Sequence, residues 1–217
     1  MRCLRGIAWL LCVGVGPVMA AEAVVHLTDG HAHAVGDAVV MLTPDARVVD
    51  KPVPRPPATY IIDQRHETFI PYVQLLRPGD KVIFRNSDVT RHHAYSFAAI
   101  KTFELVLRPG ESSPALSMDR VGIAAIGCNI HDHMITYLFV SASPAIALSG
   151  RDGIATIGDL APGRYTARVW HPQLHPGQPQ PTQTLVVADG AHDVQLDFTL
   201  SLIPDPRLFV DRGHLDY

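Results

Sequence analysis

Three side chains that bind soft metal ions stand close together between residues 128 and 134. Cys128, His131 and Met134 follow one another at intervals of three residues and offer a thiolate, an imidazole and a thioether. Copper accepts all three donor types in its two oxidation states, whereas magnesium and calcium prefer oxygen and zinc has little use for a thioether. The spacing therefore indicates a copper site.

A fourth donor can come from a pair of histidines upstream. His92 and His93 are adjacent and follow the short Asn-Ser-Asp segment 86–88. Two imidazoles and one thiolate in a plane, with a distant axial thioether, form the ligand set of a blue-copper centre. The segment 128–134, together with one member of this histidine pair, therefore predicts such a centre.

The residues before the cysteine alternate in the way that is typical of a strand. Gly122, Ala124, Ile126 and Cys128 occupy every second position, so they share one face of the strand and bring the thiol to its end. The run 135–140 predicts the next strand, which leaves a tight ligand loop between two strands. Short apolar runs between turns rich in proline and glycine predict an all-β chain built as a β-sandwich.

The first twenty residues have the pattern of a secretory signal peptide. Arg2 and Arg5 precede an apolar run over 6–15, and small residues follow at 18–20. The apolar run is too short to span a bilayer, and no later stretch is long enough, so no membrane span is expected. We therefore expect segment 1–20 to be removed and the protein to lie in the periplasm.

Removal of this segment changes the cysteine count. Cys3 and Cys12 leave with it, and Cys128 stays as a single thiol in an oxidising compartment. A single cysteine cannot form an internal disulfide, and metal ligation would protect it from oxidation. The alternative interpretation is an inert buried cysteine, which is common in protein cores. The nearby histidine and methionine favour the ligand.

Composition and motifs argue against several other classes of protein. The net charge is −3 and no run of lysine or arginine occurs, so nucleic acid and anionic membranes are poor partners. No Gly-x-Ser-x-Gly elbow and no phosphate-binding glycine loop is present. A cysteine protease would need an exposed, activated thiolate with an independent base at Cys128. We expect no enzyme.

The motifs together resemble the cupredoxin family. The Asn86-x5-His92 approach and the Cys128-x2-His131-x2-Met134 loop are similar to those of amicyanin. Bacterial cupredoxin-containing proteins labelled methylamine-utilisation proteins are still more similar, through His-His, Tyr-Ser-Phe and Gly-Cys-Asn-Ile-His-Asp. The resemblance implies a Greek-key cupredoxin β-sandwich over 22–142 and electron exchange with a redox partner protein. It also implies one type 1 copper ion bound by His92, Cys128, His131 and Met134.

Two positions depart from the family pattern. His93 stands where small cupredoxins usually have asparagine, which leaves open whether His92 or His93 is the first ligand. Overlaying His-His-Ala on the family's His-Asn-Val favours His92. His133 stands where the most similar relatives are expected to have tryptophan, so an extra imidazole is expected beside the metal.

The chain after residue 144 resembles a second family, the small carboxypeptidase regulatory-like β-sandwiches. A Gly-x-Ala-x-Ile strand at 153–157 and a Leu-x-Pro-Gly-x-Tyr turn at 160–165 carry this likeness. We expect this domain over 144–203, followed by a C-terminal tail over 204–217. His26, His31 and His33, near the start of the mature chain, are interpreted as surface histidines rather than as a second metal site.

These observations predict a periplasmic blue-copper protein that carries single electrons. Two alternatives stay open. A copper carrier, delivery or sensor protein without electron transfer would use the same ligands. A peptide- or glycan-binding sandwich in which copper is structural would instead depend on the segment 144–203.

Overall fold

The prediction of an all-β chain is confirmed by the computed structural model, which describes residues 21–45 and 55–208. Segment 1–20, the predicted signal peptide, lies outside the described residues. Within those residues the elements are β-strands and a single short 3₁₀-helix, η1 (Pro206–Leu208). No helix in the described part of the chain is long and apolar enough to cross a membrane.

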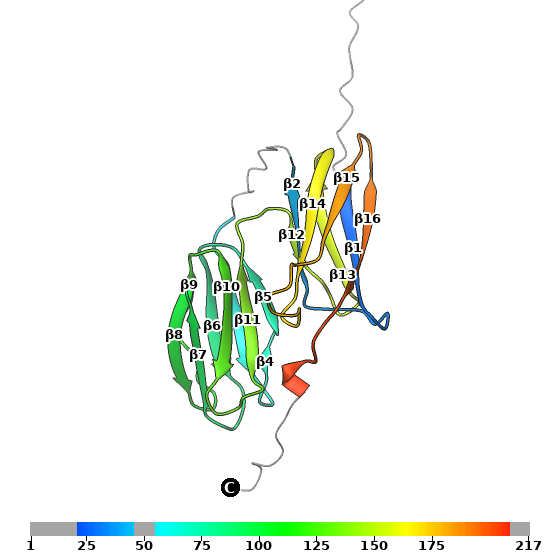
Figure 1. Ribbon diagram of the computed structural model, residues 1–217. Helices are drawn as coiled ribbons and strands as arrows, with labels where there is room; N and C mark the ends of the chain where they lie inside the picture. The colour runs from blue at the N-terminus through cyan, green and yellow to red at the C-terminus, as the bar shows by residue number, and fades with distance from the viewer. Residues whose placement is uncertain (1–20, 46–54, 209–217) are drawn as a thin grey trace, which may run out of the picture.

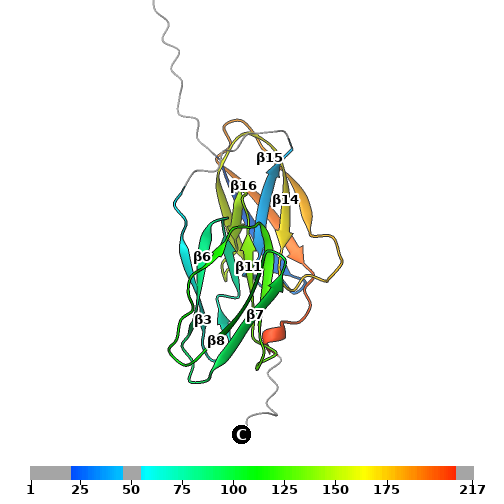
Figure 2. The same cartoon turned by 90° about the vertical axis from the view of Figure 1, so that its left-hand side faces the viewer.

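The strands form two sandwiches that lie side by side (Figure 1). The inserted sandwich comprises residues 59–140 and pairs a sheet of order β4-β3-β6-β9 with a sheet of order β5-β11-β10-β7-β8. Its strands are β3 (Thr59–Gln64), β4 (Phe69–Ile70), β5 (Val73–Leu76), β6 (Asp80–Asn86), β7 (His92–Ala98), β8 (Lys101–Leu107), β9 (Leu116–Met118), β10 (Gly122–Cys128) and β11 (Ile135–Val140). In Figure 2, where this side of the molecule faces the viewer, its strands lie in front of the other sandwich.

The second unit, the split sandwich, combines residues 21–44 with residues 146–200. Its two sheets have the orders β13-β1-β16 and β12-β2-β14-β15. The strands are β1 (Ala21–Asp29), β2 (Val39–Pro44), β12 (Ile146–Leu148), β13 (Ile154–Leu160), β14 (Gly163–Trp170), β15 (Thr182–Val187) and β16 (Asp193–Leu200). In Figure 1 the blue strands β1 and β2 lie among the yellow and orange strands of the C-terminal part.

This pairing corrects the predicted domain boundaries. The segment 22–142 was expected to form one domain, but β1 pairs with β13 and β16, and β2 pairs with β12 and β14. The N-terminal strands are therefore part of the split sandwich. The inserted sandwich, which contains the predicted metal ligands, lies between its two halves in the sequence. Alternating apolar residues tell which face of a strand is buried, but not which sheet the strand joins.

Each sandwich has its own apolar core. In β10 the buried residues are Ala124, Ile126 and Cys128, as the alternation of the sequence predicts. They belong to the core cluster of the inserted sandwich, together with Phe84, Leu138 and other residues from both of its sheets. β10 pairs along its length with β11 and at its C-terminal end with β7. The thiol of Cys128 is thus brought into a buried position at the end of a central strand.

An aromatic contact joins the two sandwiches. Trp170, the last residue of β14, packs its ring against Tyr137 at 5.7 Å and Phe139 at 5.2 Å between centroids. Both partners lie on β11 of the inserted sandwich. Val39 of β2 is fully buried in the same cluster. Aromatic pairs at these separations stabilise beyond the area that they bury.

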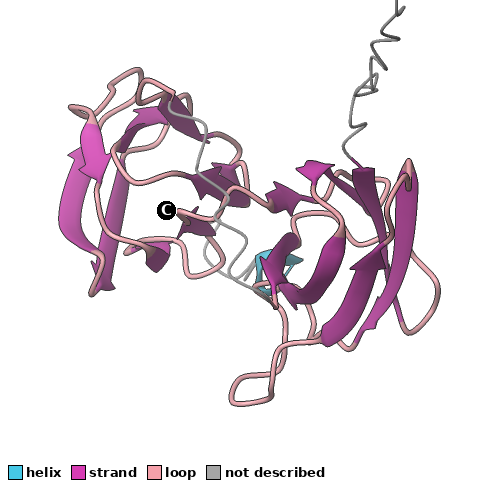
Figure 3. Cartoon of the chain, turned by 90° about the horizontal axis from the view of Figure 1, so that it is seen from above, coloured by secondary structure: helices cyan, strands magenta, loops and turns pink. Residues whose placement is uncertain are grey.

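The residues after β16 also contact the inserted sandwich. Arg207 of η1 places its guanidinium 3.4 Å from the centre of the Tyr72 ring and pairs with Asp205 at 2.6 Å. In Figure 3 the short helix, in cyan, lies between the two groups of strands. The predicted tail 204–217 therefore begins with a packed turn, and residues 209–217 lie outside the described part of the chain. A cation over an aromatic face contributes about 0.5–2 kcal/mol.

We predict that Trp170→Ala lowers the free energy of unfolding by about 2–4 kcal/mol, because it removes a large ring from the contact between the sandwiches. Phe97→Ala is the matched control, since Phe97 is 80% exposed on the outer face of β7. It should change stability by less than about 0.5 kcal/mol. Urea unfolding of both variants checks this. Equal losses would contradict a stabilising role for the Trp170 contact.

We also predict a pH dependence of stability from His171, which follows Trp170 and is 4% exposed. Burial lowers the pKa of this imidazole from 6.5 to about 4, and the charge of Arg207 acts in the same direction, while the Gly36 backbone and Asp205 oppose it. The unfolded chain therefore binds the proton first, and stability falls as the pH drops from about 6.5 to about 4. The full effect is roughly 3 kcal/mol. Unfolding across this range should be less pH-dependent in His171→Gln, and an unchanged slope would contradict the assignment.

Candidate metal centre

Three predicted ligands converge at one end of the inserted sandwich. His92 is the first residue of β7, Cys128 is the last residue of β10, and His131 lies in the loop that follows. β7 and β10 pair antiparallel with Cys128 opposite Ala94, which sets the start of β7 beside the end of β10. One nitrogen of each imidazole and the Cys128 sulfur all lie within 4.8 Å of one another.

The geometry separates the two adjacent histidines. His92 is fully buried, and its Nδ1 lies 3.8 Å from Cys128 Sγ. Successive residues of a strand point to opposite faces. His93 accordingly points outward, where its Nε2 lies 2.6 Å from Glu104 Oε1 on the neighbouring strand β8. Among this pair, only His92 belongs to the buried cluster.

Backbone hydrogen bonds close the loop between Cys128 and Met134. The amide of Cys128 donates to the carbonyl of Met134 at 3.2 Å, and the amide of Met134 donates to the carbonyl of His131 at 3.0 Å. Met134 is 1% exposed and belongs to the same core cluster as Cys128. The loop is therefore folded back on itself, and the Met134 side chain is buried in the core of the inserted sandwich.

Asn86 organises the second loop of the site, which leads into His92. It is fully buried at the end of β6, and its Nδ2 donates to the carbonyls of Thr90 at 2.8 Å and Leu107 at 2.9 Å. Its Oδ1 accepts a hydrogen bond from the amide of Asp88 at 2.9 Å. A buried side chain that satisfies its polar atoms in this way fixes the path of the loop.

The surroundings favour a thiolate at Cys128. Burial raises the pKa of the thiol, but hydrogen bonding with His92 and with the backbone of Ile130 and His93 outweighs burial, so the pKa lies below its ordinary value. For His92, burial lowers the pKa, and the contacts with Cys128 and Asp88 outweigh it and raise the pKa above its usual value. The thiolate is the form of cysteine that binds metals.

His131 presents a nitrogen that has no protein partner. Its Nδ1 is buried and makes no hydrogen bond among the described residues. Burial lowers the pKa of this imidazole below its ordinary value, which favours the neutral form of the ring. Its ring lies 5.2 Å from that of His92, measured between centroids. A buried nitrogen without a partner costs about 1–3 kcal/mol, and a metal ion in the cluster would satisfy it. The donor set of the cluster fits copper.

Two carboxylates beside the cluster were not part of the predicted site. Asp88 Oδ2 lies 2.8 Å from Nε2 of His92, and Glu67 Oε1 lies 3.5 Å from Nε2 of His131. Asp88 precedes His92 by four residues, a spacing that could have indicated it. Glu67 comes from the turn between β3 and β4, so nothing near the ligands in the sequence pointed to it. The extra imidazole, His133, also faces Glu67, at 4.0 Å.

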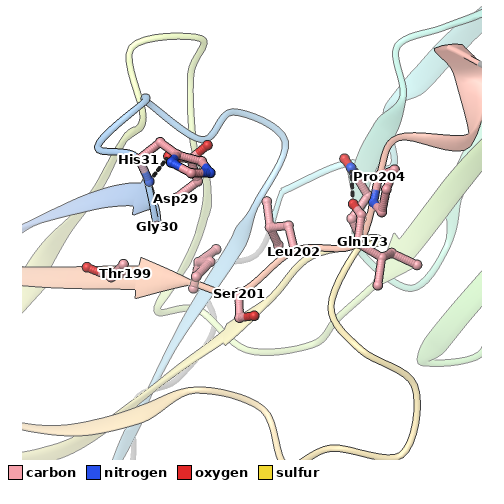
Figure 4. A pocket seen from close by; sticks show the side chains of 10 residues that line it. Asp29, Gly30, His31, Gln173, Thr199, Ser201, Leu202 and Pro204 are labelled. Carbon is pink, nitrogen blue, oxygen red and sulfur yellow. Dashed lines mark hydrogen bonds between the residues drawn. The ribbon is translucent and has the colours of Figure 1, made fainter.

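A surface cleft of about 520 Å³ lies on the split sandwich, apart from the metal cluster (Figure 4). His31, Gln173 and the end of β16 line it, with the hydroxyl groups of Thr199 and Ser201. Gln173 is held by a hydrogen bond from its Nε2 to the carbonyl of Ile203. His33, outside the cleft, has its Nδ1 3.1 Å from Asp29. The histidines of this region do not form a metal-binding cluster with one another in the described residues.

The solved structures that this chain is similar to are cupredoxins, the family that the ligand motif resembles. Amicyanin from Paracoccus versutus matches with 14% identity and a TM-score of 0.35, over 46% of this chain and 98% of amicyanin. A purple cupredoxin from Nitrosopumilus maritimus matches with 20% identity and a TM-score of 0.33, over 39% of this chain and 99% of that chain.

A copper-containing nitrite reductase from Thermus scotoductus matches with 25% identity and a TM-score of 0.34. The match covers 46% of this chain and 25% of the length of the reductase. No protein-family model and no curated protein sequence matches the chain.

Proposed function

We propose that the protein is a periplasmic type 1 copper protein that carries single electrons. Its ligands are His92, Cys128 and His131, with Met134 as the weak axial donor. The observation that carries the proposal is the convergence of a buried thiol and two imidazoles, of which His131 has a buried Nδ1 without a hydrogen-bond partner in the described part of the chain. Soft sulfur and imidazole donors in this combination select copper.

Bound copper would supply a one-electron couple between Cu(I) and Cu(II). The chain contributes a framework that limits movement of the donors. Cys128 and His92 belong to paired strands, and the loop to Met134 is closed by backbone hydrogen bonds. A site whose donors keep their positions in both oxidation states exchanges electrons with little reorganisation, and this supports the role of an electron carrier.

The surface near His131 suits contact with a redox partner protein. The His131 side chain is 19% exposed, whereas His92 is fully buried. Ile130, the residue before it, is 46% exposed, and Val89 in the neighbouring loop is 95% exposed. We propose that electrons enter and leave at the edge of His131, where apolar side chains allow a partner to approach closely.

The same ligands would serve a copper delivery or sensor protein, which is the alternative proposal. Delivery requires that an acceptor reach the ion and replace the ligands one at a time. His92 is 0% exposed and Cys128 is 4% exposed. Ligands this deeply buried hinder exchange, and this favours electron transfer over delivery.

The cleft on the split sandwich favours a second, separate role in binding. Hydroxyl, amide and imidazole groups line it, and these groups recognise the polar atoms of a peptide or glycan. This role belongs to residues outside the copper cluster. We propose it as an addition to electron transfer and propose no enzymatic activity for either sandwich.

We predict that the purified mature protein turns intensely blue or green with one equivalent of Cu(II), because of charge transfer from the Cys128 thiolate. Reduction should remove the colour and reoxidation should restore it, with the metal content unchanged. Cys128→Ser should stay nearly colourless, since an alcohol cannot replace the thiolate. Visible absorption and voltammetry check this. Rapid loss of Cu(I) to a chelator would instead support delivery, and a colourless wild-type complex would contradict a type 1 site.

We predict opposite outcomes for the same substitution at the two adjacent histidines. His92→Asn should abolish the colour and weaken Cu(II) binding by more than about 10-fold, because it removes a ligand. His93→Asn should leave both nearly unchanged, since His93 faces Glu104 on the outer surface. Cu(II) titration followed by absorption compares them. The reverse result would make His93 the ligand.

A further inference from the structure

The two imidazoles of the cluster share an arrangement that the ligand motif does not require. Each ring contributes a nitrogen to the cluster, and the Nε2 atom of each lies near a carboxylate. For His92, Nδ1 lies 3.8 Å from Cys128 Sγ, and Nε2 lies 2.8 Å from Asp88 Oδ2. For His131, Nδ1 is the buried atom without a partner, and Nε2 lies 3.5 Å from Glu67 Oε1.

The two carboxylates are also connected to each other. Asp88 accepts hydrogen bonds from the amides of His66, at 2.5 Å, and Glu67, at 2.9 Å. Asp88 therefore contacts both a candidate ligand and the turn that carries Glu67. Movement of Asp88 would therefore shift the turn that carries Glu67, because its carboxylate accepts hydrogen bonds from the backbone of that turn.

The turn that carries Glu67 has an unusual backbone. His66 and Glu67 both have a φ of 52°, in the left-handed region where glycine or asparagine is usual. Arg65 and Thr68 exchange backbone hydrogen bonds on either side, which makes this a two-residue hairpin turn. Such a conformation is strained for a residue that has a side chain, and it persists where the surroundings stabilise it. Asp88 provides that stabilisation.

We propose that Asp88 and Glu67 are positioning residues of the metal centre, which hold both candidate histidine ligands through their outward nitrogens. This rests on the proposed function, since it concerns the same site. Asp88 orients His92 directly and holds the turn that places Glu67 beside His131. Carboxylates behind ligating histidines fix the ring orientation and increase the basicity of the ligand. Their negative charge also favours Cu(II) over Cu(I).

Neutral variants of the two carboxylates test the proposal. Asp88→Asn and Glu67→Gln keep the size of the side chain and remove its charge. We expect each to weaken Cu(II) binding about 10- to 100-fold and to raise the reduction potential. Asp132→Asn is the matched control. Asp132 is exposed, adjoins His131 in sequence and makes no ion pair among the described residues. It removes the same charge and should have a much smaller effect.

One further measurement and the choice of variant keep the result decisive. Zn(II) affinity reports on the position of the imidazoles whether or not the copper complex is coloured. A colourless wild-type copper complex would therefore contradict the proposed type 1 site but would leave the positioning role of the two carboxylates open to test by Zn(II) binding. Glu67→Gln leaves Asp88 and the turn's backbone hydrogen bonds in place, so it provides the test if Asp88→Asn does not fold. Weakened Zn(II) and Cu(II) binding in Glu67→Gln but not in Asp132→Asn supports the proposal. Equal affinities and potentials in these two variants overturn it.

Discussion

The main physical constraint on this structure is the cost of burying a thiol and two imidazoles together at the end of an apolar sandwich. These groups lose contact with water when they are buried, and an unpaired one costs about 1–3 kcal/mol. Part of this cost is offset because His92 and Cys128 contact each other and because His92 also contacts Asp88. Nδ1 of His131 has no hydrogen-bond partner among the described residues. The proposed metal ion would supply the partner that this nitrogen lacks there.

Two strands, a loop and a turn hold the residues of this cluster in place. β10 carries the thiol to the end of a central strand, and β7 starts beside it with His92. Asn86 fixes the loop that leads into β7, and Asp88 ties that loop to the turn that carries Glu67. The donors therefore come from different parts of the chain, but each is attached to a hydrogen-bonded strand or turn. If the site binds copper as proposed, this framework would keep the donors in place while the ion changes oxidation state.

Residues from both halves of the split sandwich contact the inserted sandwich, Val39 from the first half and Trp170 from the second. The split sandwich is built from residues that precede and follow the inserted sandwich in the sequence. Trp170 packs on Phe139 and Arg207 on Tyr72, and both of these partners belong to the inserted sandwich. A chain cut between β11 and β12 would leave β1 and β2 without their partners in the split sandwich. The two sandwiches are consequently connected in folding as well as in position, and neither corresponds to one continuous segment.

The local part of this arrangement could be predicted from the sequence. The period of two before Cys128 indicates which face is buried, and the spacing to His131 and Met134 indicates the ligand loop. The opposite directions of His92 and His93 also follow from strand geometry once the starting face is known. The partners of β1 could not be predicted, because alternation carries no information about which sheet a strand joins. Glu67 was missed for a similar reason: a contact between distant loops leaves no local pattern.

A crystal structure of the copper-loaded protein, with copper located by anomalous scattering, would show whether the buried cluster binds the ion. We expect one copper ion bonded to Cys128 Sγ and to the Nδ1 atoms of His92 and His131, with Met134 as the distant donor and these side chains nearly unmoved. Copper bound at His93 and Glu104, or a cluster that must be rebuilt to receive the ion, would contradict this expectation.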